Sequence, residues 1–251
     1  MYKLGRNKRS FGNVPHMNMI MSNRKDTAVP ETVDWSHNIQ DFTMMLNSTL
    51  GDCTCAAIFH AIQIWTANTT IEETEPDQCV LKLYENACGY DPENRFSDQG
   101  GDCQKVLAYC VNIGVPFPND SVDKFLGFIE IDQKNIEHVK IAINEFGGVY
   151  LGIDVPVSIY DINYNPKSIW AVEGNSNIEG GHCIFAIGYD AETITIISWG
   201  QKYKMTWEFF SKYCEEAYAI ISQDWIETSG KTPLGLTTDE LENIANSIKT
   251  M

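Results

Sequence analysis

Hydrophobic and polar positions predict a buried helix early in the chain. From Cys53 to Thr66 the sequence CTCAAIFHAIQIWT is apolar almost all round, a pattern typical of a helix that is buried on every side. Asp52 directly precedes this segment, and aspartate is a favourable N-terminal cap. We therefore expect a central helix that begins at Cys53.

Apolar residues at helical spacing predict three further helices. The expected ranges are about 78–88, 102–113 and 132–146. Gly147-Gly148 ends the last helix, and apolar residues then alternate with other residues, which is typical of strands. The expected strands are 149–155, 182–189, 193–199 and 217–222. Helices followed by strands indicate an α+β protein of two lobes.

Two segments flank this globular part, which we expect to span residues 30–225. Residues 1–29 have no sustained periodicity and predict an extended basic arm. In the C-terminal extension, residues 226–251, Thr237 and Glu240 form a capping box before apolar residues at helical spacing. These apolar residues are Leu241, Ile244, Ala245 and Ile248. The expected helix packs back on the domain, with docking on a partner protein as the alternative.

Charge is distributed unevenly along the chain. The formal net charge is −16, yet residues 1–26 carry six basic residues and one acidic residue. The acidic body argues against nucleic-acid binding by the main domain, because contact with phosphates requires positive charge. For the arm, a solvated tail is the simplest expectation, and contact with nucleic acid, an acidic partner or the chain's own body remains open.

The composition indicates a protein of a reducing compartment. No run of about 18 apolar residues exists, so no segment is expected to cross a membrane. No apolar stretch follows the basic N-terminus, so we expect no secretory signal and an intracellular location. The eight cysteines are irregularly spaced, and free thiols are the expectation for them.

Cys53 and His182 are the candidate catalytic pair. At the start of a buried helix, backbone N–H groups and the helix dipole favour negative charge, which lowers the pKa of a thiol. A thiolate nucleophile needs a base, and His182 follows two glycines at the mouth of a predicted strand. The other histidines lie in the arm, in a polar stretch or on helices: His16, His37, His60 and His138.

Two simpler interpretations compete with a catalytic one. Cys53 can be a structural cysteine at the start of a buried helix. A zinc site is the metal alternative, with Cys53, Cys55, His182 and Cys183 as ligands. Adjacent strand residues point to opposite faces, which disfavours His182-Cys183 as a ligand pair. We therefore expect no metal and no other cofactor.

The chain resembles papain-type cysteine peptidases from about residue 30 to 222. The matching segments, in the family's order, are Pro30 with Val33-Asp34-Trp35, Gly51-Asp52-Cys53, His182 through Gly188-Tyr189, and Ser198-Trp199-Gly200. The resemblance implies a papain-like fold, with a helical lobe at about 45–130 and an antiparallel β-sheet or barrel lobe at about 131–225. Closer still, the chain resembles uncharacterised papain-fold proteins of tailed phages and bacteria, which share the GDCTCAA and MTW segments.

The resemblance also implies the remaining site residues. Asn47 stands where the family has an oxyanion-hole glutamine, and its amide can still donate an N–H from a shorter stem. Gly100-Gly101 resembles the glycine pair that lines the family's substrate cleft. A 29-residue arm is too short to resemble the family's inhibitory prodomain, so any control of activity must be different.

Two family positions have changed in this chain. For the asparagine that orients the histidine, counting from His182 gives Ser198, whereas alignment on Ser-Trp-Gly gives Ile197. Ser198 can accept a hydrogen bond from the imidazole and Ile197 cannot, so activity should be reduced relative to the family. The positions of the family's disulfide hold Leu50 and Asp98, which fits folding in a reducing compartment.

Two functions follow as hypotheses. The first is a cysteine-nucleophile hydrolase, a peptidase or another amide or acyl hydrolase, in which Cys53 attacks a peptide or protein substrate and His182 transfers the proton. Asn47 and the Cys53 backbone N–H would hold the oxyanion. The second is a weakened or inactive papain-fold binding or structural protein, in the specific version a phage virion component that assembles through its arm or C-terminal helix.

Overall fold

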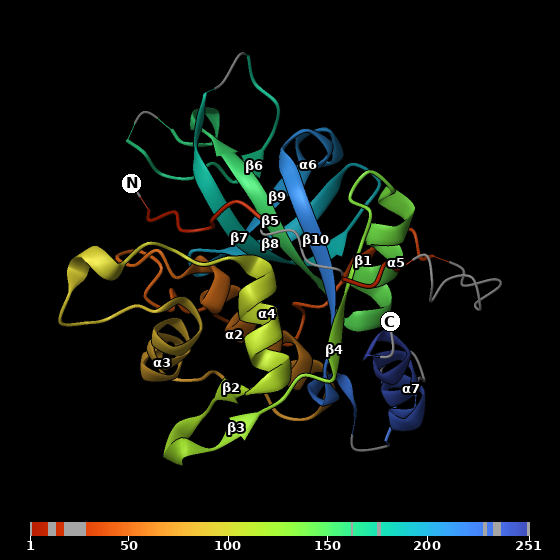
Figure 1. Cartoon of the computed structure of the whole chain (residues 1–251). Coiled ribbons are helices and arrows are strands. Elements are labelled where there is room, and N and C mark those ends of the chain that lie inside the picture. The colour runs from red at the N-terminus through yellow and green to blue at the C-terminus, as the bar shows by residue number, and fades with distance from the viewer. Residues whose placement is uncertain are drawn as a thin grey trace.

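The computed structural model describes residues 2–9, 14–17, 29–161, 163–174, 177–227, 230–232 and 237–249. Three helices lie together on one side, and a mostly antiparallel β-sheet with its own helices forms the other side (Figure 1). The α+β architecture of two lobes that the sequence predicts is therefore confirmed. Among the described residues, no helix has both the length and the hydropathy needed to cross a bilayer.

The helical lobe is built around one buried helix. Helix α2 (Cys53–Thr69) is flanked by α3 (Asp77–Cys88) and α4 (Cys103–Asn112), so all three helix predictions for this lobe are confirmed. Helix α2 also packs against strand β7 of the sheet. Its sequence is apolar all round because neighbours cover it on every side. A hairpin of β2 (Val115–Pro116) and β3 (Val122–Asp123) closes the lower end.

The sheet has the strand order β4-β10-β5-β7-β8-β9-β6, and β1 pairs with β7 outside this path. The strands are β1 (Val33–Asp34), β4 (Gly127–Glu130), β5 (Val149–Pro156), β6 (Ile169–Trp170), β7 (Ile178–Tyr189), β8 (Thr193–Ser198), β9 (Gln201–Thr206) and β10 (Cys214–Ile221). All four predicted strands are present. Because β4 pairs with β10, the sheet begins before residue 131.

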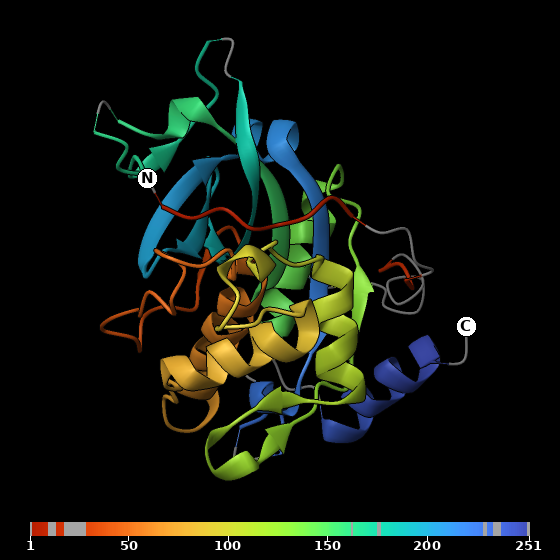
Figure 2. The same cartoon turned by 60° about the vertical axis from the view of Figure 1, so that its left-hand side comes forward.

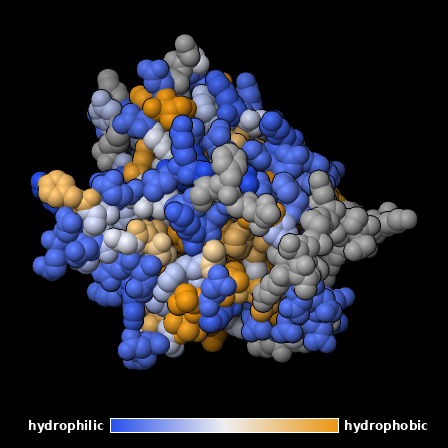
Figure 3. All heavy atoms as spheres, viewed as in Figure 1, coloured by the Kyte–Doolittle hydropathy of each residue, from blue (hydrophilic) through white to orange (hydrophobic). Residues whose placement is uncertain are grey.

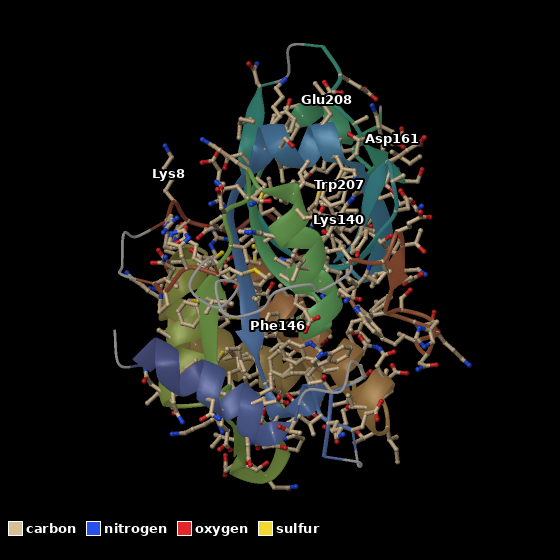
Figure 4. All side chains as sticks on the ribbon, turned by 90° about the vertical axis from the view of Figure 1, so that its right-hand side faces the viewer. Lys8, Lys140, Phe146, Asp161, Trp207 and Glu208 are labelled. Carbon is tan, nitrogen blue, oxygen red and sulfur yellow. The ribbon has the colours of Figure 1, made fainter. Side chains whose placement is uncertain are left out.

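Two helices pack with the sheet away from α2. Helix α5 (Ile136–Phe146) and helix α6 (Trp207–Tyr213) meet where Lys140 lies 5.4 Å from the centre of the Trp207 ring (Figure 4). The expected start of α5 after Asp132 is wrong, because the Asn135 side chain accepts the N-terminal bond from the His138 backbone. The chain leaves α5 through Gly147 with φ +70°, which confirms the predicted end.

Helix α7 (Thr238–Lys249) ends the described chain. The predicted capping box is confirmed. The Glu240 carboxylate accepts from the Thr237 backbone N–H at 2.8 Å, and the Glu240 backbone N–H donates to the Thr237 hydroxyl at 3.3 Å. Leu241 is buried, on a helix that packs against β4. The side chains of Ile244, Ala245 and Ile248 lie outside the described residues.

Most of the face in Figure 3 is hydrophilic, as expected for an acidic protein. Hydrophobic side chains gather in its lower part, over α4 and the β2–β3 hairpin. Ile113 and Val122 are about half exposed there, at 53% and 55%. In the middle of this face, where the two lobes meet, most of the coloured side chains are hydrophilic.

Candidate active site

The start of α2 and the middle of β7 bring the two predicted catalytic residues together. The backbone N–H of Cys183 donates to the Cys53 sulfur at 3.3 Å, so the residue directly after His182 touches the candidate nucleophile. No hydrogen bond joins the Cys53 sulfur to the His182 ring within the described part of the chain, and the buried Nδ1 of His182 has no partner there. Cys53 thus contacts the backbone of β7 beside His182, and no hydrogen bond between thiol and imidazole is formed among the described residues.

Ser198 is the residue that contacts the other nitrogen of His182. Nε2 of the ring lies 2.8 Å from the Ser198 hydroxyl. Ile197 instead lies in the core beneath the helical lobe, because adjacent residues of β8 face opposite sides of the sheet. Trp199 stacks on the His182 ring with centroids 4.3 Å apart and planes 15° from parallel. The structure thus resolves the two sequence alignments in favour of Ser198.

Asn47 is buried near Cys53, but its amide hydrogens are already used. Nδ2 donates to the Leu50 carbonyl at 3.2 Å and to the Asp52 carboxyl at 3.0 Å. An amide has only two N–H hydrogens. Asn47 as an oxyanion donor therefore remains a prediction that requires one of these bonds to be exchanged.

Asp52 takes the N-cap position of α2 without acting as the expected side-chain cap. Its carboxyl group instead accepts from Asn47, and its Oδ2 has no partner among the described residues. Burial raises the pKa of Asp52 to about 8, against a smaller lowering by the Asn47 bond. The side chain is therefore mostly protonated at neutral pH and adds little negative charge beside Cys53.

The expectation of a low thiol pKa at Cys53 is wrong for this state of the molecule. Burial raises the pKa of Cys53 well above its usual value, and the N–H groups of Cys183 and Gly5 offset only part of the effect. Burial lowers the pKa of His182 to about 3, with the positive charge of Arg6 as a smaller cause. Removal from water disfavours both ions, so thiol and imidazole are neutral here.

A carboxylate occupies the place of the family's missing disulfide. Asp98 accepts from the Gly51 backbone N–H at 2.9 Å and from the Tyr84 hydroxyl at 2.7 Å. The Tyr84 oxygen in turn accepts from the Gly100 backbone N–H at 2.9 Å. These bonds connect the segment before Cys53 to the predicted cleft glycines without a covalent link. All eight cysteines are free thiols.

Residues 2–9 of the arm cross the boundary between the two lobes, directly over this site (Figure 2). The Gly101 N–H donates to the Gly5 carbonyl at 2.8 Å, and the Asn7 N–H donates to the Gly101 carbonyl at 2.8 Å. On the other side, the Arg6 N–H donates to the Gly181 carbonyl at 2.9 Å. Of the two glycines that the resemblance assigns to substrate binding, Gly101 thus pairs with the chain's own arm, and a Cβ at Gly100 would lie 2.0 Å from the Gly5 carbonyl oxygen.

Side chains of the arm also bind the acidic body, so the expectation of a solvated tail is wrong for residues 2–9. The Tyr2 ring stacks on Trp199 at 5.2 Å, and the Lys3 ammonium lies 3.2 Å from the Asp98 carboxylate. Arg9 makes two bonds to Glu130, at 2.5 and 2.6 Å. Hollows of about 290, 280 and 340 Å³ along this path all include arm residues in their walls.

Gly5 is the arm residue that faces Cys53. A Cβ atom at Gly5 would lie 1.9 Å from the Gly51 carbonyl oxygen, so only glycine fits this approach. The Gly5 backbone N–H lowers the Cys53 pKa, against the larger effect of burial. The arm therefore brings a hydrogen-bond donor, the Gly5 N–H, to the sulfur.

The zinc alternative finds no support. Within the described ranges, no three or more His, Cys, Asp or Glu side chains are grouped so that they could hold a metal ion. The Cys55 thiol interacts with Cys88, which is not one of the proposed zinc ligands.

Sequence reasoning missed Gly5, Arg6 and Glu216, which meet at this site through the arm. One signal was available, since the arm is basic and the body acidic. No local pattern gave the positions at which the two would meet.

Comparison with known structures identifies the fold. Xylellain, a cysteine protease from Xylella fastidiosa, has a TM-score of 0.65 at 17% identity over 88% of this chain and 96% of that chain. The Amb a 11 cysteine protease of ragweed pollen, in its proform, has a TM-score of 0.60 at 18% identity over 84% of this chain and 71% of that chain. Bromelain from Ananas comosus, in complex with the E64 inhibitor, has a TM-score of 0.55 at 14% identity over 78% of this chain and 100% of that chain.

These similarities show that the chain has the papain-like fold of cysteine proteases, as predicted. No protein-family model matches the sequence, and no curated protein matches it. None of the three structural neighbours is a phage protein, so the resemblance to phage proteins stays a prediction.

Proposed function

We propose that this papain-fold chain is a cysteine peptidase, with Cys53 as nucleophile and His182 as general base. One observation carries the proposal: the His182 ring bonds Ser198 through Nε2, and its buried Nδ1, without a partner among the described residues, lies beside the residue that touches the Cys53 sulfur. When Nε2 donates its proton to Ser198, the lone pair of Nδ1 is free to accept one. A histidine held in this way is suited to take the thiol proton.

The reaction follows from this arrangement. The Cys53 sulfur attacks the carbonyl carbon of a peptide bond while its proton passes to Nδ1 of His182. His182 then gives that proton to the departing amine, which leaves the acyl group on the sulfur as a thioester. Water attacks the thioester with His182 again taking a proton, and the carboxylic acid product leaves as the thiol is restored.

The backbone N–H of Cys53, at the start of α2, is the proposed first donor to the oxyanion. Asn47 is the proposed second donor, after it releases Leu50 or Asp52. Peptide is the proposed substrate class because Gly101 offers both a backbone N–H and a carbonyl to an extended chain, as its pairing with Gly5 and Asn7 illustrates.

Activity requires the arm to move away from the Cys53 sulfur. The test therefore uses a variant in which the arm cannot bind in its native position. Gly5→Ala places a methyl group against the Gly51 carbonyl and should displace the arm without touching the catalytic residues. Lys8→Ala is the matched control, because Lys8 is exposed and points away from the body (Figure 4).

The measurement is cleavage of a mixed peptide library, followed by mass spectrometry. We expect the Gly5→Ala chain to cleave, the Lys8→Ala chain to behave like the native chain, and Gly5→Ala with Cys53→Ala to show no cleavage. Cleavage that persists without the Cys53 thiol, or none by the opened chain, would refute the peptidase proposal.

A further inference from the structure

Arg6 of the arm enters a pocket in the sheet lobe close to the candidate active site. Its side chain is only 3% exposed, and Glu216 at the pocket floor is fully buried. The guanidinium Nη1 donates to Glu216 at 2.9 Å, and Nη2 forms a short ion pair with Asp154 at the pocket mouth. Two carboxylates from different strands, β10 and β5, thus share one guanidinium.

The backbone around the pocket leaves room for a long side chain. A Cβ at Gly152 would lie 2.7 Å from the Arg6 Cδ and 2.5 Å from the Glu216 Cγ. A Cβ at Gly181 would lie 2.3 Å from the Arg6 carbonyl oxygen. The β10–β5 register shifts between Cys214 and Glu216, and such a bulge redirects a side chain. The space exists because two strands carry glycine where the arginine passes.

Glu216 is held ready for a cation even apart from Arg6. The Tyr218 hydroxyl donates to its Oε2 at 2.8 Å, which leaves Oε1 for the guanidinium. A fully buried carboxylate is costly unless a positive partner faces it. Burial works to lower the Arg6 pKa, but the bond to Glu216 and the nearby charges leave it raised. The pocket is therefore complementary to a positive charge.

We propose that this pocket is a recognition site for the arginine side chain of a peptide substrate, and that Arg6 is its internal occupant. The proposal rests on the proposed peptidase function and names a feature of its substrate. Arg6 pairs with Gly181, the residue before His182, and Gly5 packs against Gly51, two residues before Cys53, so a bound arginine would hold a neighbouring peptide bond close to the nucleophile. A planar guanidinium can reach Glu216 and Asp154 at once, whereas one lysine ammonium is a point charge.

The test measures binding without catalysis. The full chain carries Arg6→Ala, which empties the pocket, and Cys53→Ala, which prevents cleavage. The probe is a fluorescent peptide of the arm's own residues 2–9, compared with the same peptide carrying neutral citrulline in place of Arg6. Fluorescence anisotropy gives both affinities, and Lys8→Ala with Cys53→Ala is the control in which Arg6 still fills the pocket.

We expect the arginine peptide to bind the emptied chain at least about tenfold more tightly than the citrulline peptide. Adding Glu216→Gln should abolish this preference, and adding Asp154→Asn at the half-exposed pocket mouth should reduce it. The Lys8→Ala control should bind either peptide weakly. Equal affinity for the two peptides, or no binding to an emptied chain that is folded at the temperature of the assay, would overturn the proposal.

Cleavage separates this proposal from the proposed function. Peptide pairs that differ only by arginine or citrulline are given to the Gly5→Ala chain with Cys53 intact. If the arginine preference in binding holds but neither peptide is cleaved, the peptidase function fails and the pocket stands. If both are cleaved equally, the pocket assignment fails and the peptidase function stands.

Discussion

Asp52 shows how burial beside the nucleophile changes the chemistry of a single residue. Its folded-state pKa of about 8 lies far above the usual 3.8. Between these values the unfolded chain is ionised while the folded chain must keep its proton. The stability contributed by the neutral form is thus complete below about pH 4 and is lost as pH rises to about 8.

Asp52→Asn should remove this pH dependence. We expect the free energy of unfolding of the variant, minus that of the native chain, to increase steadily between about pH 4 and about pH 8. Urea unfolding at several pH values in this range measures the difference. Parallel stability curves for the two proteins would show that Asp52 ionises freely in the folded state.

Ser198→Ala should weaken catalysis by removing the partner of His182 Nε2. In the Gly5→Ala background we expect kcat/KM for peptide cleavage to fall by about tenfold or more, because the tautomer and ring direction are no longer fixed. The dependence of kcat/KM on pH should also broaden or shift, while the thermal stability of the variant changes little. Unchanged kcat/KM and pH profile would mean that Trp199 stacking alone orients the ring.

For single residues, the sequence predicted which positions belong to the site better than their protonation and hydrogen bonds. The start of the buried helix gave Cys53 from local periodicity, whereas Ser198 came from the family resemblance, by counting from His182, with Ile197 as the alternative. The protonation of Asp52 and the bonds of Asn47 depend on burial by distant segments. A pKa is set by the three-dimensional surroundings of a group, which a linear pattern does not contain.

Among the elements, α5 ends at a glycine that has both a conformational and a packing reason to be there. Gly147 has φ +70°, and a Cβ atom there would lie 2.7 Å from the Trp225 ring and 2.8 Å from Trp65. Gly89 ends α3 with φ +76°, and among the described residues no atom lies within 4 Å of such a Cβ. An alanine at either position would adopt a strained backbone conformation, but only an alanine at position 147 would also overlap with neighbouring side chains.

Gly147→Ala should destabilise the protein clearly more than Gly89→Ala. The Gly89 variant should lose about 1 kcal/mol through left-handed strain alone. The Gly147 variant adds overlap with two tryptophans, for a total of about 3 kcal/mol or more. Urea unfolding of both variants gives the comparison, and equal losses would exclude a packing role for Gly147.

The long, periodic elements were the predictable ones. Helix α2 and strand β7 carry their own pattern over many residues. Helix α6 has only seven residues, and the polar segment QKYKMT becomes β9 because it pairs with β8. Short elements of this kind are stabilised by their neighbours more than by their own sequence.

At the scale of the molecule, the arm joins what the sequence presents as separate parts. Charge alone predicts attraction between a basic N-terminus and an acidic body. The position of the arm on the body is fixed by three contacts that only the folded structure shows. Gly5 fits closely against Gly51, Arg6 enters the pocket that holds Glu216, and the backbone of Gly101 pairs with the arm. The arm thus lies beside a sulfur whose pKa is raised by burial, and the Gly5 N–H offsets only part of that rise.

The most direct test of the account is the pH dependence of Cys53 alkylation by iodoacetamide, measured by mass spectrometry in the native and Gly5→Ala chains. The native chain should react slowly, as should the Lys8→Ala control. The opened chain should react at least about tenfold faster, with a midpoint below the ordinary thiol pKa of about 8.5, and His182→Ala should abolish that shift. An opened chain whose Cys53 reacts no faster than in the native chain, or whose midpoint ignores His182, would contradict the account.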